Sequence, residues 1–387
     1  MRIVDIKEFT LNTGEKRANA VMDFSGMTTG FVALVTDVVR NGKPVVGYGF
    51  SGTGRYSQNA ICRERLIPRL LSAPAETLLD ETADNFDPFR VWDCMMRNEK
   101  PGGHGDRAIA VATLDMAVWD AAAKIAEEPL YSFLAKRHGP GDPPARVPVY
   151  VGGGYYGPGR DYGLLQDEVR RYLDDGFTVV KIKFAGAPLE EDLRRIDALL
   201  EVLPAGRLAI DANGRYTLDE ALACAEKIAP YGLRWFEEPG YPLDYQLLSQ
   251  VAKAYEGPLA GGECLLSSWD AKNLLRYGGM RPDRDILQFD CALSYGICEY
   301  IRTIAVMEEC GWSRSSLFPH GGHLLSLHIT AGLGLGGTEV YPYTHQPVGG
   351  FTDGLEVADG SAALPQLPGL GFEGKSNLHE LLSQRFG

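Results

Sequence analysis

The chain has 387 residues, which is long for one domain and comfortable for two. Hydrophobic residues make up 45% and charged residues 23%, ordinary values for a globular protein, and no apolar run approaches the ~20 residues of a membrane span. The net charge of −13, without any block of Lys and Arg, argues against nucleic acid and anionic membranes as partners. Because the first residues also lack the apolar core of a signal peptide, we expect a cytoplasmic location.

The cysteines predict no disulfide framework. Their number is odd, the chain is large, and none of them forms a CxxC pair, so we expect free thiols in a reducing compartment. They stand at positions 62, 94, 224, 264, 291, 298 and 310.

The first part of the chain predicts an α+β domain over residues 1–142. Strand-like segments at Ile3–Leu11 and Gly30–Thr36 precede a region of helical patterns, of which the Ala-rich Ala108–Ala122 is the clearest. The segment Gly139–Pro144 is rich in Gly and Pro and marks the expected boundary.

Residues 143–342 alternate between strand and helix patterns, and they predict a barrel domain. Eight parallel strands at this pitch favour a closed (β/α) barrel over an open sheet. The tail, 343–387, is rich in Gly and Pro, and we expect it to pack back on the first domain. The candidate strands are Val147–Val151, Thr178–Lys183, Leu208–Asp211, Leu233–Glu237, Leu259–Glu263, Asp285–Asp290, Ser316–His320 and Thr338–Tyr341.

Three acidic residues recur at a fixed interval of 26 residues: Asp211, Glu237 and Glu263. A lone Asp or Glu is more often a helix cap or a surface residue, but here each follows or ends a short apolar segment. Active sites of (β/α) barrels lie at the C-terminal ends of the strands, so the three carboxylates should converge. Oxygen ligands suit a hard cation, and we predict one Mg²⁺ per chain.

Two lysines share one face of the second barrel strand. Side chains alternate along a strand, so Lys181 and Lys183 point the same way, and an apolar Ile182 facing the helices would turn both inward. A pair of lysines on an edge strand is the plainer reading of this motif alone. Next to the spaced acids we expect Lys183 to be a general base, with its pKa depressed toward neutrality by desolvation, Lys181 and the metal.

Asp290 and His320 end the sixth and seventh expected strands. Adjacent strand ends bring them within hydrogen-bonding distance, where the carboxylate would orient the imidazole and raise its basicity. A structural role before Gly321–Gly322 is the alternative for His320. We expect His323 at the start of a helix and His328 within it, neither of them catalytic.

Four further residues are candidates for binding the substrate. Asn213 lies two residues past Asp211 and could face the barrel mouth, while Glu339, on the eighth strand, is either a substrate ligand or a buried partner for a lysine. A loop before the long first-domain helix could cap the barrel through Lys100 or His104, and a plain connecting loop is equally consistent with its sequence.

These motifs together resemble the enolase superfamily, specifically its mandelate-racemase-like subgroup. The resemblance covers nearly the whole chain. It implies a modified (β/α)7β barrel of the TIM type with an α+β capping domain built from both termini, Mg²⁺ on the three acids, Lys183 as an acid/base beside Lys181, and the His320–Asp290 dyad on the opposite face. The motifs are Lys181-Ile182-Lys183, Asp211-Ala212-Asn213, Trp235-Phe236-Glu237-Glu238-Pro239, Gly262-Glu263, Asp290 and His320.

Within the subgroup, Lys100–Arg107, Asp285–Gly296 and Phe318–Gly337 look like D-tartrate dehydratase and related acid-sugar dehydratases. This resemblance implies a lyase that takes an α-proton from a small anionic hydroxy acid, stabilises the enediolate with Mg²⁺ and expels the β-hydroxyl, with D-tartrate to oxaloacetate as the expected reaction. It also places specificity in cap loops around Met22–Gly30 and Ser51–Tyr56. The alternatives are a racemase or epimerase of an α-hydroxy acid and, more remotely, a non-catalytic binding barrel. We also expect a homo-oligomer.

Overall fold

A three-stranded antiparallel sheet opens the chain. The computed structural model describes residues 1–157 and 161–387, and its first sheet consists of β1 (Ile3–Asn12), β2 (Thr28–Arg40) and β3 (Lys43–Phe50) in that order. The third strand was missing from the sequence prediction. Its Gly47 and Gly49 allow a helix to approach closely, because a Cβ at either position would lie 2.0 Å from the carbonyl oxygen of Ala117 or Thr113.

The helix that lies on this sheet is α4 (Asp106–Ile125), which contains the predicted Ala108–Ala122. Its small residues are buried on almost every side, which suits a helix packed between the sheet and the rest of the molecule. The other helices of this part are α1 (Ser57–Ile61), the π-helical turn η2 (Cys62–Leu66), α2 (Ile67–Ser72), α3 (Pro88–Met96) and α5 (Leu130–His138).

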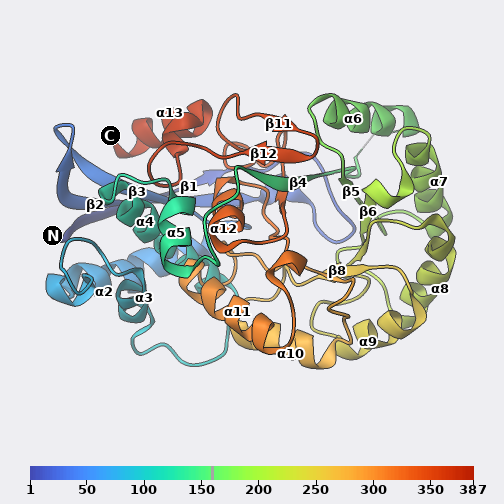
Figure 1. Ribbon diagram of the computed structural model, residues 1–387, viewed down its shortest axis with the longest axis horizontal. Coiled ribbons are helices and arrows are strands. Elements are labelled where there is room, and N and C mark those ends of the chain that lie inside the picture. Colours follow the sequence, from blue (N-terminus) through green and yellow to red (C-terminus); the bar gives the residue numbers. More distant parts are fainter. Residues whose placement is uncertain (158–160) are drawn as a thin grey trace.

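The second part is a barrel of parallel strands surrounded by helices (Figure 1). Its strands are β4 (Arg146–Gly153), β5 (Val180–Lys183), β6 (Leu208–Asp211), β7 (Phe236–Glu237), β8 (Leu259–Gly261), β9 (Ile286–Leu287) and β10 (Thr338–Val340). Its helices are α6 (Tyr162–Asp174), α7 (Leu189–Leu200), α8 (Leu218–Ile228), α9 (Tyr245–Ala254), α10 (Ser268–Tyr277), α11 (Ile297–Glu309) and α12 (Leu324–Leu333).

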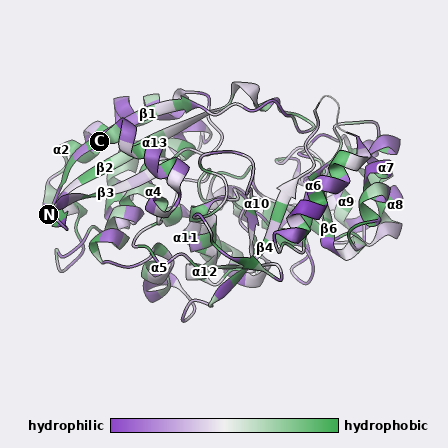
Figure 2. Ribbon diagram, turned by 90° about the horizontal axis from the view of Figure 1, so that it is seen from above, coloured by the Kyte–Doolittle hydropathy of each residue, from purple (hydrophilic) through white to green (hydrophobic). Residues whose placement is uncertain are grey.

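The barrel helices are amphipathic. Figure 2 shows hydrophilic and hydrophobic residues side by side along α6, α7 and α8. In α7 the buried apolar residues Leu193, Ile196 and Leu199 recur at helical spacing, so one stripe of the helix packs on the strands. None of the described helices combines the length and apolar character needed to cross a membrane.

One of the predicted strands does not form as a regular strand. Ser316–His320 contributes an isolated bridge, Leu287 with Leu317, in place of a strand. The segment still closes the ring, because Phe318 N donates to Leu287 O on one side and Glu339 N donates to Pro319 O on the other. Since β10 pairs with β4, the strands form a closed barrel with one irregular member, which confirms the predicted fold class.

The C-terminal tail contacts both parts of the molecule. Strands β11 (Val357–Ala358) and β12 (Ser361–Ala363) extend the barrel sheet beyond β4, whereas α13 (Ser376–Phe386) lies against the first sheet. There the ring of Phe386 lies 5.0 Å from that of Phe9, and Lys7 Nζ donates to Phe386 O. The domain limits at 142 and 342 stay a prediction.

Candidate active site

The three spaced acids converge at one end of the barrel. Asp211 and Glu237 are the last residues of β6 and β7 and are paired in register. Glu263 lies two residues past β8, after Gly262, whose φ of 117° suits glycine. One carboxylate oxygen from each residue lies within 4.8 Å of the others, so a single ion could contact all three.

These residues fit a hard divalent cation. All three donors are carboxylates, and Oε2 of Glu263 is buried without a hydrogen bond from any described residue, as expected for an atom that ligates an ion. A second possible group, Glu238, Glu263 and Cys264, lies alongside. Its thiol suits softer metals, so the all-oxygen group is the better match for Mg²⁺.

Lys181 and Lys183 both face this cluster from inside the barrel. Lys183 Nζ lies 2.5 Å from Oδ2 of Asp211, and Lys181 Nζ lies 2.7 Å from Oε1 of Glu237. Without a bound metal, burial lowers the pKa of Lys183, but the negative groups around it, Asp211 first among them, together outweigh burial and raise the pKa above the ordinary value. A cation on Asp211 would share that carboxylate and weaken this effect. The expected depression therefore depends on the ion.

Glu237 has neighbours that sequence reasoning missed. Trp235 Nε1 and Gln288 Nε2 donate to its Oε2 at 2.9 and 2.7 Å, and all three side chains are fully buried. Trp235 could have been found, because it lies two residues before Glu237 on the same strand face. Burial, together with the charge of Asp211, raises the pKa of Glu237 to about 7.

The predicted dyad forms as expected. Nδ1 of His320 lies 2.7 Å from Oδ2 of Asp290, which turns Nε2 toward Glu263 and Glu339 at 3.5 and 3.7 Å. Burial lowers the pKa of His320, but Glu263, Glu339 and Asp290 together raise it to about 10. His323 is the N-cap of α12, where it accepts a hydrogen bond from Ser326 N, and His328 lies within that helix, so both are placed as predicted.

A cavity of about 450 Å³ joins these groups to the first domain. The specificity loops expected from the sequence contribute to its walls, as do residues from a segment just before them. The lining includes Arg17, Met22, Phe24, Met27, Gly52, Thr53, Arg55, Tyr155, Lys183, Asn213, Glu263, Cys264, Asp290, His320, Tyr341 and His345. Lys183 and the dyad therefore open into one space with the metal-ligand candidate Glu263.

Of the four residues predicted to bind the substrate, one lines the cavity and three do not. Asn213 lines the cavity and also donates through its backbone N and Nδ2 to Asp211 at 2.8 and 3.1 Å. Glu339 is buried behind the cavity, 2.8 Å from Lys181 Nζ, which is the alternative role considered for it. Lys100 and His104 lie outside the lining, because Nδ1 of His104 is hydrogen-bonded to Tyr295 OH and Lys100 is exposed.

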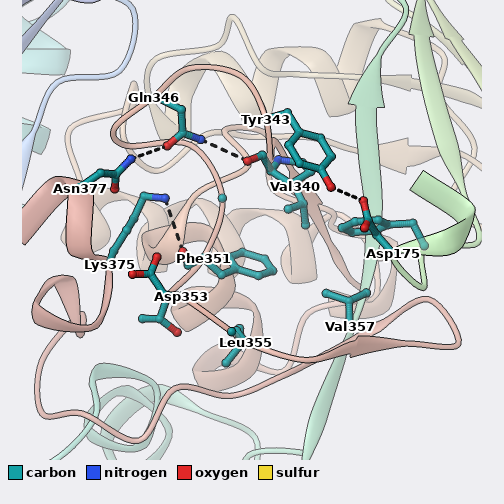
Figure 3. A pocket seen from close by; sticks show the side chains of 15 residues that line it. Asp175, Val340, Tyr343, Gln346, Phe351, Asp353, Leu355, Val357, Lys375 and Asn377 are labelled. Carbon is teal, nitrogen blue, oxygen red and sulfur yellow. Dashed lines mark hydrogen bonds between the residues drawn. The ribbon is translucent and has the colours of Figure 1, made fainter. Parts of the chain in front are cut away.

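A second cavity of about 390 Å³ lies under the C-terminal tail, between β10 and the start of α13 (Figure 3). The buried Lys375 points into it, and its Nζ lies 3.5 Å from Phe351 O. None of the predicted catalytic or metal-binding residues lines this cavity, so it is separate from the candidate active site.

Two family models match the chain. Residues 6–135 match the mandelate racemase / muconate lactonizing enzyme N-terminal domain, and residues 164–377 match the enolase C-terminal domain-like family. Together these matches cover most of the first sheet with its helices and the barrel from β5 onward, including the three acids.

Characterised relatives are similar along most of their length. Arabinonate dehydratase from Saccharolobus solfataricus is 28% identical over 98% of both chains. The 3,6-anhydro-alpha-L-galactonate cycloisomerase of Streptomyces coelicolor is 28% identical over 91% of this chain and 90% of its own. L-talarate/galactarate dehydratase from Salmonella typhimurium is 26% identical over 88% and 80%.

Among solved structures, a racemase from Streptomyces coelicolor with bound magnesium superposes with a TM-score of 0.78, at 25% identity and 99% coverage of both chains. The prediction of a magnesium cofactor is confirmed by two findings. A related structure holds the ion, and this chain has three converging carboxylates that can bind it. The prediction that the chain is an enzyme is confirmed by its named relatives. The chain belongs to the mandelate racemase/muconate lactonizing enzyme group of the enolase superfamily.

Proposed function

We propose that this protein is a Mg²⁺-dependent dehydratase of a sugar acid. The observation that carries the proposal is the shared cavity: the side chains of Lys183 and His320 both open into it beside the acidic cluster. Two of the three relatives described above are dehydratases of sugar acids. D-tartrate, the substrate expected from the sequence, is one member of the wider class to be tested.

The residues have separable roles in this reaction. When bound by Asp211, Glu237 and Glu263, Mg²⁺ supplies positive charge to the substrate carboxylate, where negative charge grows as the α-proton leaves. Lys183 accepts the α-proton as a neutral amine, the form that a cation on Asp211 would favour, and Lys181 stays paired with Glu237 and Glu339, which holds the lysine strand in place. The α-carbon must therefore lie next to Lys183 Nζ.

His320 serves the departing hydroxyl. Asp290 accepts the hydrogen bond from Nδ1, so Nε2 is the ring nitrogen that faces the cavity. Nε2 donates a proton to the β-hydroxyl, the Cβ–O bond breaks and water leaves, and the electron pair of the former Cα–H bond forms the double bond. The resulting enol takes a proton at the β-carbon and becomes a 2-oxo acid.

A second candidate is racemisation or epimerisation. Two proton-transfer groups that line one cavity could remove and return an α-proton from opposite faces of the substrate, and the magnesium-bound structural neighbour is described as a racemase. In that reaction His320 would deliver its proton to the α-carbon and no oxo acid would form.

The deciding test is a screen of sugar acids and hydroxy dicarboxylic acids, D-tartrate included, for 2-oxo acid formation with Mg²⁺. Dehydration predicts at least one acid that yields oxo acid, that stops doing so after chelation, and that the Lys183→Ala variant fails to convert. Inversion of configuration without oxo acid would select the second candidate.

A further inference from the structure

The cavity wall also holds an arginine with unused hydrogen-bonding capacity. Arg17 follows β1, and its side chain is 10% exposed. Nε, Nη1 and Nη2 are all buried, and none of them makes a hydrogen bond to any atom of the residues that the structure describes. Because a buried guanidinium normally uses its donors, this group calls for a partner from the cavity.

The guanidinium is held in position from two sides. Its carbon lies 4.5 Å from the ring centroid of Tyr155 and 5.6 Å from that of Phe24. Nη2 lies 2.9 Å from Oε2 of Glu15, a charge contact whose geometry is not that of a hydrogen bond. Glu15 therefore balances the charge of Arg17 while leaving the planar fork of donors available.

The segment that carries Arg17 is anchored to the barrel. Ala18 and Tyr156 exchange backbone hydrogen bonds of 3.1 and 3.0 Å, and Phe24 N donates to Arg17 O. The side chain of Asn19 accepts from the backbone N of Val21 and Met22, which fixes the following turn. Arg17 is thus pre-positioned at the cavity wall.

The arginine and the proposed base both lie against Tyr155. Lys183 Nζ lies 5.6 Å from the Tyr155 ring centroid, and the guanidinium carbon of Arg17 lies 4.5 Å from the same centroid. A substrate whose α-carbon lies at Lys183 would extend its far end past this ring. The fork of an arginine matches a carboxylate, which accepts two parallel hydrogen bonds.

We propose that Arg17 binds the second carboxylate of the substrate, so that the enzyme acts on sugar diacids in preference to monoacids. This inference rests on the proposed function for its reaction, but it concerns a separate contact. Arg55 also lines the cavity, yet it is exposed and its Nη1 donates to Gly54 O, so Arg17 is the better-formed carboxylate site.

The test compares sugar diacids with monoacids of the same carbon skeleton and configuration, in which a primary alcohol replaces the far carboxylate. Galactarate with galactonate is one such pair, and D-tartrate with D-threonate is another. Binding is measured by calorimetry with Mg²⁺, and turnover is measured as oxo acid formation. Binding is informative even if no acid is dehydrated, so failure of this inference is distinguishable from failure of the proposed reaction.

The wild-type protein should bind at least one diacid more tightly than its monoacid. Arg17→Met should weaken diacid binding on the order of 10- to 100-fold and leave monoacid binding within about threefold, because only the diacid loses a charged hydrogen-bonded pair. Arg17→Lys should give an intermediate loss. Glu15→Gln should not weaken diacid binding, since it leaves the donors of Arg17 available and removes a negative charge that would repel the second carboxylate.

Three results would overturn the inference: a wild-type preference for monoacids, an equal effect of Arg17→Met on both members of a pair, or no diacid bound at all. Circular dichroism and an unchanged Mg²⁺ affinity would establish that the variant is folded.

Discussion

Lys181 and Glu339 form an ion pair of 2.8 Å in which both side chains are completely buried. Glu339 is therefore a counterion for a barrel lysine, which explains why an acid at the eighth strand does not line the cavity. Removing one charge of a buried pair is costly, because the other charge stays buried without compensation.

Glu339→Gln should lower the free energy of unfolding by about 3 kcal/mol, the low end for such pairs, since Glu237 still contacts Lys181. KM for the active sugar acid should change less than about threefold, because Glu339 makes no wall of the cavity. Urea denaturation and steady-state kinetics check the two parts. Glu356→Gln, at an exposed ion pair with Arg146, is the matched control. A large rise in KM with unchanged stability would make Glu339 a substrate ligand after all.

Two variants distinguish between the two overlapping groups of candidate metal ligands. Glu237→Gln should weaken Mg²⁺ binding on the order of 100-fold, because it removes a carboxylate ligand. Cys264→Ser should leave the affinity within about threefold, since Cys264 belongs only to the group that suits softer metals. Calorimetric titration with Mg²⁺ measures both. The opposite ranking would move the site to Glu238, Glu263 and Cys264.

Lys183→Ala should reduce kcat on the order of 10³-fold, because the variant loses the group that accepts the α-proton. Lys136→Ala is the control, since Lys136 is an exposed lysine paired with Glu128 away from the cavity. Steady-state turnover of the sugar acid that the screen identifies provides the measurement. A Lys183→Ala enzyme within about tenfold of the wild type would be incompatible with a base at this position.

The buried His328 should make the protein less stable toward unfolding in mild acid. Tyr131 N donates to its Nδ1 at 3.0 Å and its Nε2 donates to Leu370 O at 3.1 Å, and burial lowers the pKa of His328 to about 4. The unfolded chain binds the proton near pH 6.5. The stabilisation from neutral His328 is therefore complete above that pH and is lost as the pH falls toward 4, by about 2 kcal/mol at pH 5.

His328→Gln can keep one acceptor and one donor but does not titrate. It should reduce the difference in unfolding free energy between pH 7 and pH 5 by about 2 kcal/mol, and the exposed His379→Gln should leave that difference unchanged. Urea unfolding at the two pH values measures it. An unaltered pH dependence in His328→Gln would show that other groups set the acid sensitivity.

The acidic cluster and the two lysines could be predicted because they follow from local rules. Strand ends meet at one edge of a barrel, and alternate residues share a face, so Asp211, Glu237, Lys181 and Lys183 converge wherever the strands form. The dyad of His320 could be placed even though its strand is irregular, because backbone bonds to both neighbours keep the segment in the ring.

The cavity walls could not be predicted in the same way. His104 is in a loop whose position depends on a contact with Tyr295, almost two hundred residues away, and no periodic pattern reports such a contact. Arg17 lies in an irregular segment that gains its place only by bonding to the barrel at Tyr156. The expected depression of the Lys183 pKa rested on burial, Lys181 and a bound metal, and it left out the ion pair with Asp211, which raises that pKa when no metal shares the carboxylate.

The measurement that tests the account most directly is turnover of the active sugar acid in D₂O with Mg²⁺, followed by NMR of substrate and product. Dehydration by Lys183 and His320 predicts a 2-oxo acid that carries solvent deuterium at the β-carbon, and a His320→Asn enzyme that still exchanges the α-proton while forming far less oxo acid. Recovery of the inverted substrate, labelled at the α-carbon with no oxo acid formed, would contradict the dehydratase assignment.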